Sequence, residues 1–277
     1  MRAWVAPSPL SQGAGFSFLA PYSCESSSID SSGCGREAAR TGADSELANR
    51  VLIIGVGGLG VPAATGLARS GIAAIAVADA EAVELSNLAR QVIYRTSDIG
   101  EPKVRAAARR LTSEFPSLEV ECLELEINPD NASRTIAAYD FVIDGTDNPA
   151  TKFLINDSCI AARRPFVYGG VLGLRGQAMT VIPGRTACLR CLFEEPPLEA
   201  EIASCRDAGI LGPIAAAIGA LEASEAAAFI RGATLALAGR MLTYDATALS
   251  RIRVTPVRPR SGCACGAASA SAAASLG

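Results

Sequence analysis

The sequence predicts an α/β fold with a Rossmann-like, doubly wound and mostly parallel sheet, followed by a C-terminal subregion of antiparallel strands. Two observations lead to this prediction. Stretches that suit strands alternate with stretches that suit helices from Val51 to Gly170, as in a parallel sheet with crossover helices. The first strand also runs directly into a glycine-rich turn, VLIIGVGGLG over residues 51–60, which is typical of the first strand–helix unit of such a sheet.

The elements of the parallel part follow one another with short connections. Strand 51–55 leads into a helix over 59–70, which Ser70-Gly71 ends because glycine suits the residue after a helix. Pro102-Lys103 opens a helix that runs to Glu114, since proline is tolerated at the first helical turn. The other predicted elements are strand 74–79, strand 119–126, helix 130–138, strand 140–144, helix 150–162 and strand 166–169.

The sequence changes character after Gly170. QAMTVIP over 177–183 suits a strand, and a loop rich in Glu and Pro covers 193–201. Helices are expected within 212–238 and a pair of strands within 240–256. We therefore predict one continuous domain over 47–266, between an N-terminal extension (1–46) and a tail (267–277) whose small and polar residues predict disorder.

Composition narrows the classes of function. The net charge is −3 and the isoelectric point is near 5.2, so the chain lacks the basic footprint of a nucleic-acid-binding protein. Prolines at 7 and 9 interrupt the N-terminus, so no signal peptide is expected. The apolar stretch 210–239 contains Glu222, Glu225 and Arg231, which makes it a poor membrane span. We expect a cytoplasmic enzyme with no membrane or nucleic-acid partner.

The glycines at 55, 57, 58 and 60 predict a nucleotide site. A strand that turns through glycines into a helix points the first N–H groups of the helix at a phosphate. Asp79, at the end of the next strand, lies at the spacing that suits a ribose hydroxyl. Alone, this pattern also fits an NAD-dependent oxidoreductase. The chain contains no histidine, however, and hydride-transfer enzymes commonly use one as their acid or base.

Charged residues after the glycine turn favour a polyphosphate. Asn87, Arg90 and Lys103 follow Asp79, and the two cations suit phosphate oxygens, although a solvated surface is the alternative. Asp147 follows strand 140–144, where a carboxylate can hold Mg²⁺ on a nucleotide. The alternative role of Asp147 is a helix N-cap, and Asp144, within the strand, is expected to be structural.

The cysteines predict a zinc knuckle. Cys188 and Cys191 have the CxxC spacing that brings two thiolates to one Zn²⁺, and Cys263 and Cys265 would complete four sulfur ligands. A CxC pair is tighter than a second CxxC, so free thiols are the alternative. Cys205 lies next to Arg206, and a neighbouring cation favours a nucleophilic thiolate, although a structural thiol is equally compatible. The remaining cysteines are expected in the core or in the terminal extension: Cys24, Cys34, Cys122 and Cys159.

These motifs together resemble the MoeB/ThiF/HesA family, the bacterial relatives of ubiquitin-activating enzymes. The resemblance covers residues 47–266. Besides VLIIGVGGLG and Asp79, it is carried in order by VELSNLARQ (83–91), GEPK (100–103), DGTDN (144–148), CLRC (188–191) and SCRDAG (204–209).

The resemblance implies an adenylyltransferase that uses ATP and Mg²⁺. The expected substrate is the C-terminal Gly-Gly carboxylate of a small ubiquitin-like sulfur-carrier protein, which would form an acyl-adenylate and pyrophosphate in molybdopterin, thiamine or related sulfur-transfer biosynthesis. The resemblance assigns nucleotide contacts to Gly55, Gly57, Gly58, Gly60, Asp79, Ser86, Asn87, Leu88, Ala89, Arg90, Lys103, Asp147 and Asn148. Among these, Arg90, Lys103 and Asp147 are the expected catalytic residues, and Cys205 aligns with a thiol that links covalently to the carrier in some relatives.

The same resemblance implies a homodimer with structural Zn²⁺, served by a separate sulfur-donor protein. One departure from the family pattern leaves a further alternative. Family members carry an Arg-Tyr-x-Arg-Gln pattern on an N-terminal helix, and its first Arg reaches into the partner subunit's ATP site. This pattern is absent here, although Arg36 and Arg40 lie nearby in a different context. A relative that binds the carrier with impaired catalysis is therefore the second alternative to the adenylyltransferase.

Overall fold

The computed structural model describes residues 50–196, 209–248 and 251–266. Eight strands form one sheet in the order β3-β2-β1-β4-β5-β6-β7-β8. The first five strands in this order are parallel, and β6, β7 and β8 are added by antiparallel pairing. The predicted doubly wound sheet with an antiparallel C-terminal part is thus confirmed.

The parallel half contains most of the helices. Its elements are β1 (Val51–Ile54), α1 (Gly60–Arg69), β2 (Ala74–Ala78), α2 (Lys103–Glu114), β3 (Glu119–Leu123), α3 (Ala132–Ala137), β4 (Phe141–Asp144), α4 (Pro149–Ala162) and β5 (Phe166–Leu172). Two short 3₁₀ turns, Leu85–Asn87 and Thr96–Asp98, lie between β2 and α2. The C-terminal half contains β6 (Arg175–Val181), α5 (Leu189–Leu192), α7 (Gly212–Ile230), β7 (Arg240–Asp245), a 3₁₀ turn at Ala246–Ala248 and β8 (Arg251–Pro256).

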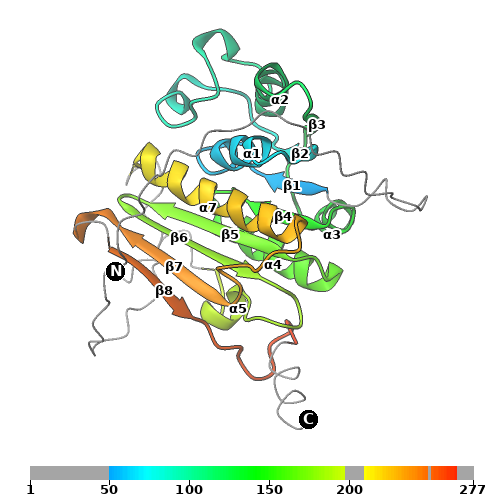
Figure 1. The fold of residues 1–277 in the computed structure, drawn as a ribbon, viewed down its shortest axis with the longest axis vertical. Coiled ribbons are helices and arrows are strands. Elements are labelled where there is room, and N and C mark those ends of the chain that lie inside the picture. The colour runs from blue at the N-terminus through cyan, green and yellow to red at the C-terminus, as the bar shows by residue number, and fades with distance from the viewer. Residues whose placement is uncertain (1–49, 197–208, 249–250, 267–277) are drawn as a thin grey trace, which may run out of the picture. The chain divides into compact units, whose positions relative to one another are not determined.

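Helices cover both faces of the sheet, with α1 and α7 on one face and α3, α4 and α5 on the other (Figure 1). Strand β1 shows why its sequence is apolar throughout. Val51 and Ile53 pack in the core beneath α1, α2 and α7, whereas Leu52 and Ile54 pack in the core beneath α3 and α4. A strand that is buried on both faces needs no polar alternation.

Several predicted boundaries are wrong. The third strand ends at Leu123 instead of 126, and its Cys122 is exposed, because β3 is an edge strand with only one neighbour. Strand β5 continues to Leu172 because it pairs with β6 beyond its contact with β4. One helix, α7, ends at Ile230, where the sequence predicted helices to 238.

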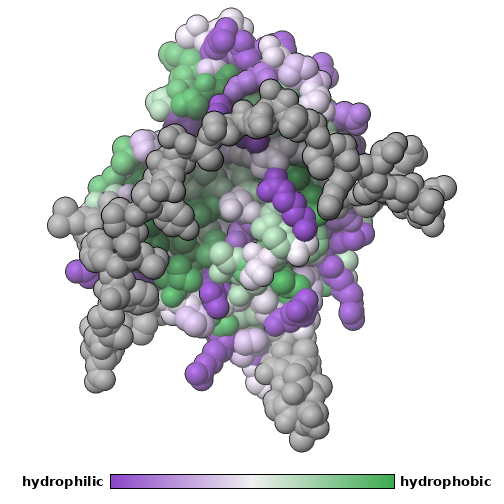
Figure 2. Space-filling view, viewed as in Figure 1, coloured by the Kyte–Doolittle hydropathy of each residue, from purple (hydrophilic) through white to green (hydrophobic). Residues whose placement is uncertain are grey.

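Among the described residues, only α7 is long and apolar enough to cross a membrane. Its composition has another explanation in this fold, since α7 packs against α1, β4, β5 and β6, and its Glu222 and Glu225 are buried. Its outward residues are small, so the exposed side of α7 appears pale to light green at the centre of Figure 2, with purple charged side chains around it. The apolar length of α7 is therefore that of a core helix.

Candidate active site

A cavity of about 970 Å³ opens at the carboxyl ends of β1, β2 and β4. In a doubly wound sheet this edge, where the strand order reverses between β1 and β4, is the usual place for a ligand. Most of the residues that the sequence assigns to a nucleotide site line this cavity: Gly55, Gly57, Gly58, Asp79, Ser86, Asn87, Arg90, Lys103, Asp147 and Asn148. Gly60, Leu88 and Ala89 do not line it.

The glycines of the turn divide into two kinds. Gly55 has φ +86°, and a Cβ built on it would lie 2.9 Å from the Gly145 carbonyl oxygen. A Cβ on Gly60 would lie 1.8 Å from the Gly55 oxygen, so no side chain fits there. Gly57 and Gly58 have ordinary surroundings and face the cavity. The first pair lets the chain turn tightly, and the second leaves room for a ligand against the backbone.

Asp79 connects the turn to the neighbouring strand. One carboxylate oxygen accepts the Val56 N–H at 2.8 Å, and the other accepts the Glu81 N–H at 2.8 Å. Burial raises the pKa of Asp79, although both backbone hydrogen bonds act in the opposite direction. The buried Tyr94 hydroxyl also holds the turn, because it donates to the Val56 carbonyl at 2.8 Å. The glycine turn is therefore fixed by side chains from two later segments.

The segment 84–91 presents Asn87 and Arg90 to the cavity. Asn87 is buried, and its amide oxygen accepts the Glu84 N–H, which shapes the 3₁₀ turn. The Arg90 guanidinium donates to the Ser86 carbonyl at 3.2 Å and is half-buried. Arg90 is therefore held at the cavity by its own loop.

Lys103 lies at the start of α2 and is only 3% exposed. Its ammonium pairs with Glu81, a largely exposed side chain that also lines the cavity. A buried ammonium with one exposed partner retains two further hydrogens for a ligand's oxygens. The burial of Lys103 rules out the alternative of a solvated surface lysine.

The residues after β4 have separate roles. The Asn148 side chain caps α4, because its oxygen accepts the N–H groups of Ala150 and Thr151 at 2.8 and 3.3 Å. The alternative that Asp147 is the N-cap is therefore wrong, and Asp147 instead lies exposed at the cavity wall. Asp144 is fully buried and accepts the Thr146 hydroxyl at 2.6 Å, as expected of a structural residue. The exposed Asp147 carboxylate has the oxygen chemistry that Mg²⁺ prefers.

Several residues that line the cavity were not predicted from the sequence. Gln91 is 2% exposed, and its Oε1 has no hydrogen-bond partner among the described residues. Gln91 follows Arg90 directly at the end of the motif VELSNLARQ, and this position could have identified it as a site residue. Lys152, Tyr168 and Gln177 also line the cavity, and they lie on α4, β5 and β6 outside any motif of the sequence.

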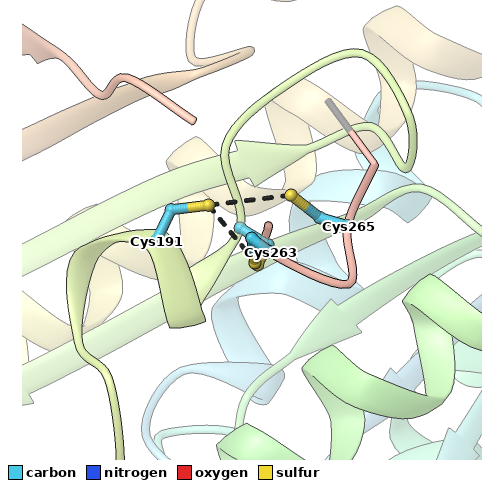
Figure 3. A group of neighbouring side chains, drawn as sticks. Cys191, Cys263 and Cys265 are labelled. Atoms are coloured by element: carbon cyan, nitrogen blue, oxygen red, sulfur yellow. Dashed lines mark hydrogen bonds between the residues drawn. The ribbon is translucent and has the colours of Figure 1, made fainter. Parts of the chain in front are cut away.

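The four predicted zinc ligands lie together. The Sγ atoms of Cys188, Cys191, Cys263 and Cys265 are all within 4.8 Å of one another, with 3.6 Å between Cys191 and Cys265 and 4.0 Å between Cys188 and Cys191. Figure 3 shows Cys191, Cys263 and Cys265 turned toward one another. Four sulfurs at Zn–S bonds of ~2.3 Å lie ~3.8 Å apart in a tetrahedron. The CxC spacing is therefore compatible with a zinc site.

The predicted nucleophile and the terminal segments are not among the residues that the structure describes. Cys205 lies outside the described residues, as do the segments 1–49 and 267–277. The predicted role of Cys205 and the predicted disorder of the two terminal segments stay predictions.

Comparison with known proteins identifies the family and two similar enzymes. Residues 36–265 match the ThiF family. The chain is 37% identical to a sulfur carrier protein adenylyltransferase of Thermus thermophilus over 210 residues, which are 74% of this chain and 78% of that protein. It is 39% identical to the adenylyltransferase and sulfurtransferase MOCS3 of Aedes aegypti, over 76% of this chain and 48% of that protein. The chain thus spans about half the length of such two-activity relatives.

A solved structure shares the fold. The crystal structure of E. coli MccB with ATP superposes with a TM-score of 0.69 at 22% identity, over 79% of this chain and 66% of that chain. This match agrees with the predicted fold, and the family match confirms the resemblance that the motifs indicated. The chain belongs to the ThiF family.

Proposed function

We propose that this protein is an ATP-dependent adenylyltransferase that activates the C-terminal Gly-Gly carboxylate of a ubiquitin-like sulfur-carrier protein. One relative, matched over 74% of this chain and 78% of its own length, is a sulfur carrier protein adenylyltransferase. The observation that carries the proposal is the content of one cavity. Its glycine turn, the cations Arg90 and Lys103 and the Asp147 carboxylate suit a magnesium nucleotide.

The same cavity continues beyond the residues proposed to bind the nucleotide. It extends along Gly170, Val171 and Leu172 of β5 and along Gly176 and Gln177 of β6. The cavity beside these strands has room for an extended chain, although the Cβ positions of Gly170 and Gly176 are themselves filled by Tyr168 and by Ile218 of α7. Both reactants therefore have a place in one continuous space.

The reaction needs little chemistry from the protein. A carboxylate oxygen of the tail forms a bond to the α-phosphorus, and the bond from that phosphorus to the bridging oxygen breaks, which releases pyrophosphate. The carboxylate is an anion at pH 7, so no general base is required. Catalysis then depends on alignment and on neutralising phosphate charge. A chain without histidine is suited to this chemistry.

Each candidate residue has a role in this proposal. The helix start after Gly58 and the cations Arg90 and Lys103 bind the phosphates, and Asp79 receives the ribose. Asp147 would hold Mg²⁺, which neutralises phosphate charge when bound. The four cysteines would hold a structural Zn²⁺. We also propose a cytoplasmic homodimer, a separate protein as sulfur donor, and a covalent link through Cys205.

The test is exchange of labelled pyrophosphate into ATP, measured with a purified sulfur-carrier protein that ends in Gly-Gly. We expect exchange that depends on the carrier and that falls by about 10²–10³-fold in Asp147→Ala. The control is Asp157→Asn, which removes a carboxylate on α4 that pairs with Arg190 outside the cavity and is expected to retain exchange.

Other outcomes contradict the proposal in different ways. Tight binding of NAD⁺ without binding of ATP indicates an oxidoreductase. Binding of the carrier without formation of an adenylate indicates a non-catalytic relative.

A further inference from the structure

The chain contains only two lysines, Lys103 and Lys152, among 25 basic residues. Both are nearly fully buried, at 3% and 4% exposure, and both line the same cavity. Every other basic residue is arginine. Lysine offers a compact point charge with three donors, whereas arginine presents a wide planar fork. Both lysines therefore place a buried, compact charge at one cavity.

Lys152 lies on α4, and its ammonium reaches the end of the parallel sheet. Nζ donates to the Gly169 carbonyl at 2.6 Å and to the Asp144 carboxylate at 3.3 Å, and it lies 5.1 Å from the centre of the Tyr168 ring. These contacts account for two of its three hydrogens. The ammonium is therefore held in place with one donor still available.

The position of Lys152 differs from that of the phosphate cations. Strand β4 pairs with β5 only as far as Asp144 and Tyr168, and β5 then continues beside β6 alone. Lys152 lies at this divergence, because its ammonium contacts Asp144 at the end of β4 and Gly169 of β5, and it lines the same cavity as Asp147 and Gly170. This is the place where a carboxylate from the tail side would meet a phosphate from the nucleotide side.

The charges around Lys152 permit an anion to approach. Glu222 of α7 is fully buried, lies against Gly169, and has no hydrogen-bond partner for either oxygen among the described residues. Burial raises the pKa of Glu222 well above its usual value, which favours the neutral form. Asp144 then balances Lys152 alone, so the pair repels an incoming carboxylate less than a cluster with two charged carboxylates would.

We propose that Lys152 is a catalytic residue that binds the C-terminal carboxylate of the substrate beside the α-phosphate. This inference rests on the proposed function and adds a residue to it. Arg90 and Lys103 bind the phosphates, and Lys152 orients the attacking oxygen and lowers the repulsion between the two anions.

The test is a double-mutant cycle between Lys152 and the tail carboxylate. Dissociation constants are measured for a Gly-Gly-ended sulfur-carrier protein and for the same protein with a C-terminal carboxamide, both with a non-hydrolysable ATP analogue bound. We expect the wild type to prefer the carboxylate by about 10–100-fold, as for a charged hydrogen bond. Lys152→Gln should bind both forms within about threefold. Arg175→Gln removes another cation of the same cavity wall, one that pairs with Asp245, and should retain the wild-type preference.

Three results would overturn the inference: no preference in the wild type, an unchanged preference in Lys152→Gln, or an equal loss in both variants. Failure of the wild type to bind either carrier contradicts the proposed function, and the inference with it. Should Lys152→Gln not fold, the wild type labelled with ¹⁵Nζ-lysine gives two signals, which Lys103→Arg assigns. The Lys152 signal should shift with the carboxylate carrier and not with the carboxamide, and equal shifts would overturn the inference.

Discussion

The backbone N–H of Val56, inside the glycine turn, donates a 2.8 Å hydrogen bond to the carboxylate of Asp79 at the end of the neighbouring strand. The residue expected to bind the ribose therefore also fixes the loop expected to bind the phosphates. Burial raises the pKa of Asp79, so the two backbone donors are important for keeping its charged form. The Asp79 side chain is therefore expected to contribute both to nucleotide binding and to the stability of the glycine turn.

Asp79→Ala is expected to weaken nucleotide binding and to lower the free energy of unfolding by about 1–3 kcal/mol, since the Val56 N–H loses its acceptor. Asp79→Asn retains one acceptor oxygen and should lose less stability. Nucleotide titration and urea unfolding of both variants measure the two effects. Full stability in Asp79→Ala would show that Asp79 does not hold the turn.

Gly60 and Gly58 offer a matched pair of substitutions in the same turn. A Cβ on Gly60 would lie 1.8 Å from the Gly55 oxygen, so Gly60→Ala should lower the free energy of unfolding by about 3 kcal/mol or more. A Cβ on Gly58 meets nothing closer than 3.5 Å, so Gly58→Ala should change stability by less than about 1 kcal/mol.

Gly58 faces the cavity, however, and its Cβ would occupy space next to a bound phosphate. Gly58→Ala should therefore weaken nucleotide binding by about tenfold, or about 1.4 kcal/mol. Denaturant unfolding and nucleotide titration separate the two glycines. Equal stability of the two variants would contradict the division of the turn into structural and ligand-facing glycines.

The parallel half of the fold was predictable because its signals are local. The apolar run at 51–54, the glycine turn and the alternation of strands and helices each lie within a short window of sequence. The end of α7 was also marked locally, by Arg231-Gly232, and Gly232 has φ +64°. The sequence predicted helices as far as 238, across an Ala- and Leu-rich stretch that follows α7.

What the sequence could not show depends on contacts between distant segments. Strand β5 extends to Leu172 only because β6 pairs with it, and Lys152 reaches the cavity only because α4 packs beside the ends of β4 and β5. In the sequence, Lys152 is a single charge within a helix and belongs to no motif. The motif residues of the site were predictable, whereas the wall formed by β5, β6 and α4 was not.

The cysteine cluster predicts a metal dependence. Cys188→Ser should reduce bound zinc from about one per chain and lower the unfolding temperature, because the cluster joins α5 to the segment after β8. Cys122→Ser, which changes an exposed cysteine outside the cluster, should retain both. Elemental analysis and thermal unfolding measure the two properties. Equal metal content in both variants would mean that the four thiols do not hold the metal.

The buried Glu222 predicts a pH dependence of stability. The groups that face it are Lys152, Asp144 and Tyr168, and burial, the largest effect, raises its pKa well above 4.5. The folded state therefore holds a proton that the unfolded state releases above pH 4.5. By linkage, the stability that this group contributes is present below the unfolded pKa and is lost as pH rises toward the folded pKa.

Glu222→Gln retains the shape of the side chain and removes its titration. We expect the free energy of unfolding of Glu222→Gln to exceed that of the wild type increasingly as pH rises above 4.5, by about 1.4 kcal/mol for each pH unit between the two pKa values. Urea unfolding of both proteins at pH 5, 6, 7 and 8 measures this difference. A constant difference over that range would show that Glu222 keeps an ordinary pKa. Glu222 would then be charged beside Asp144, and Lys152 would face two carboxylates instead of one.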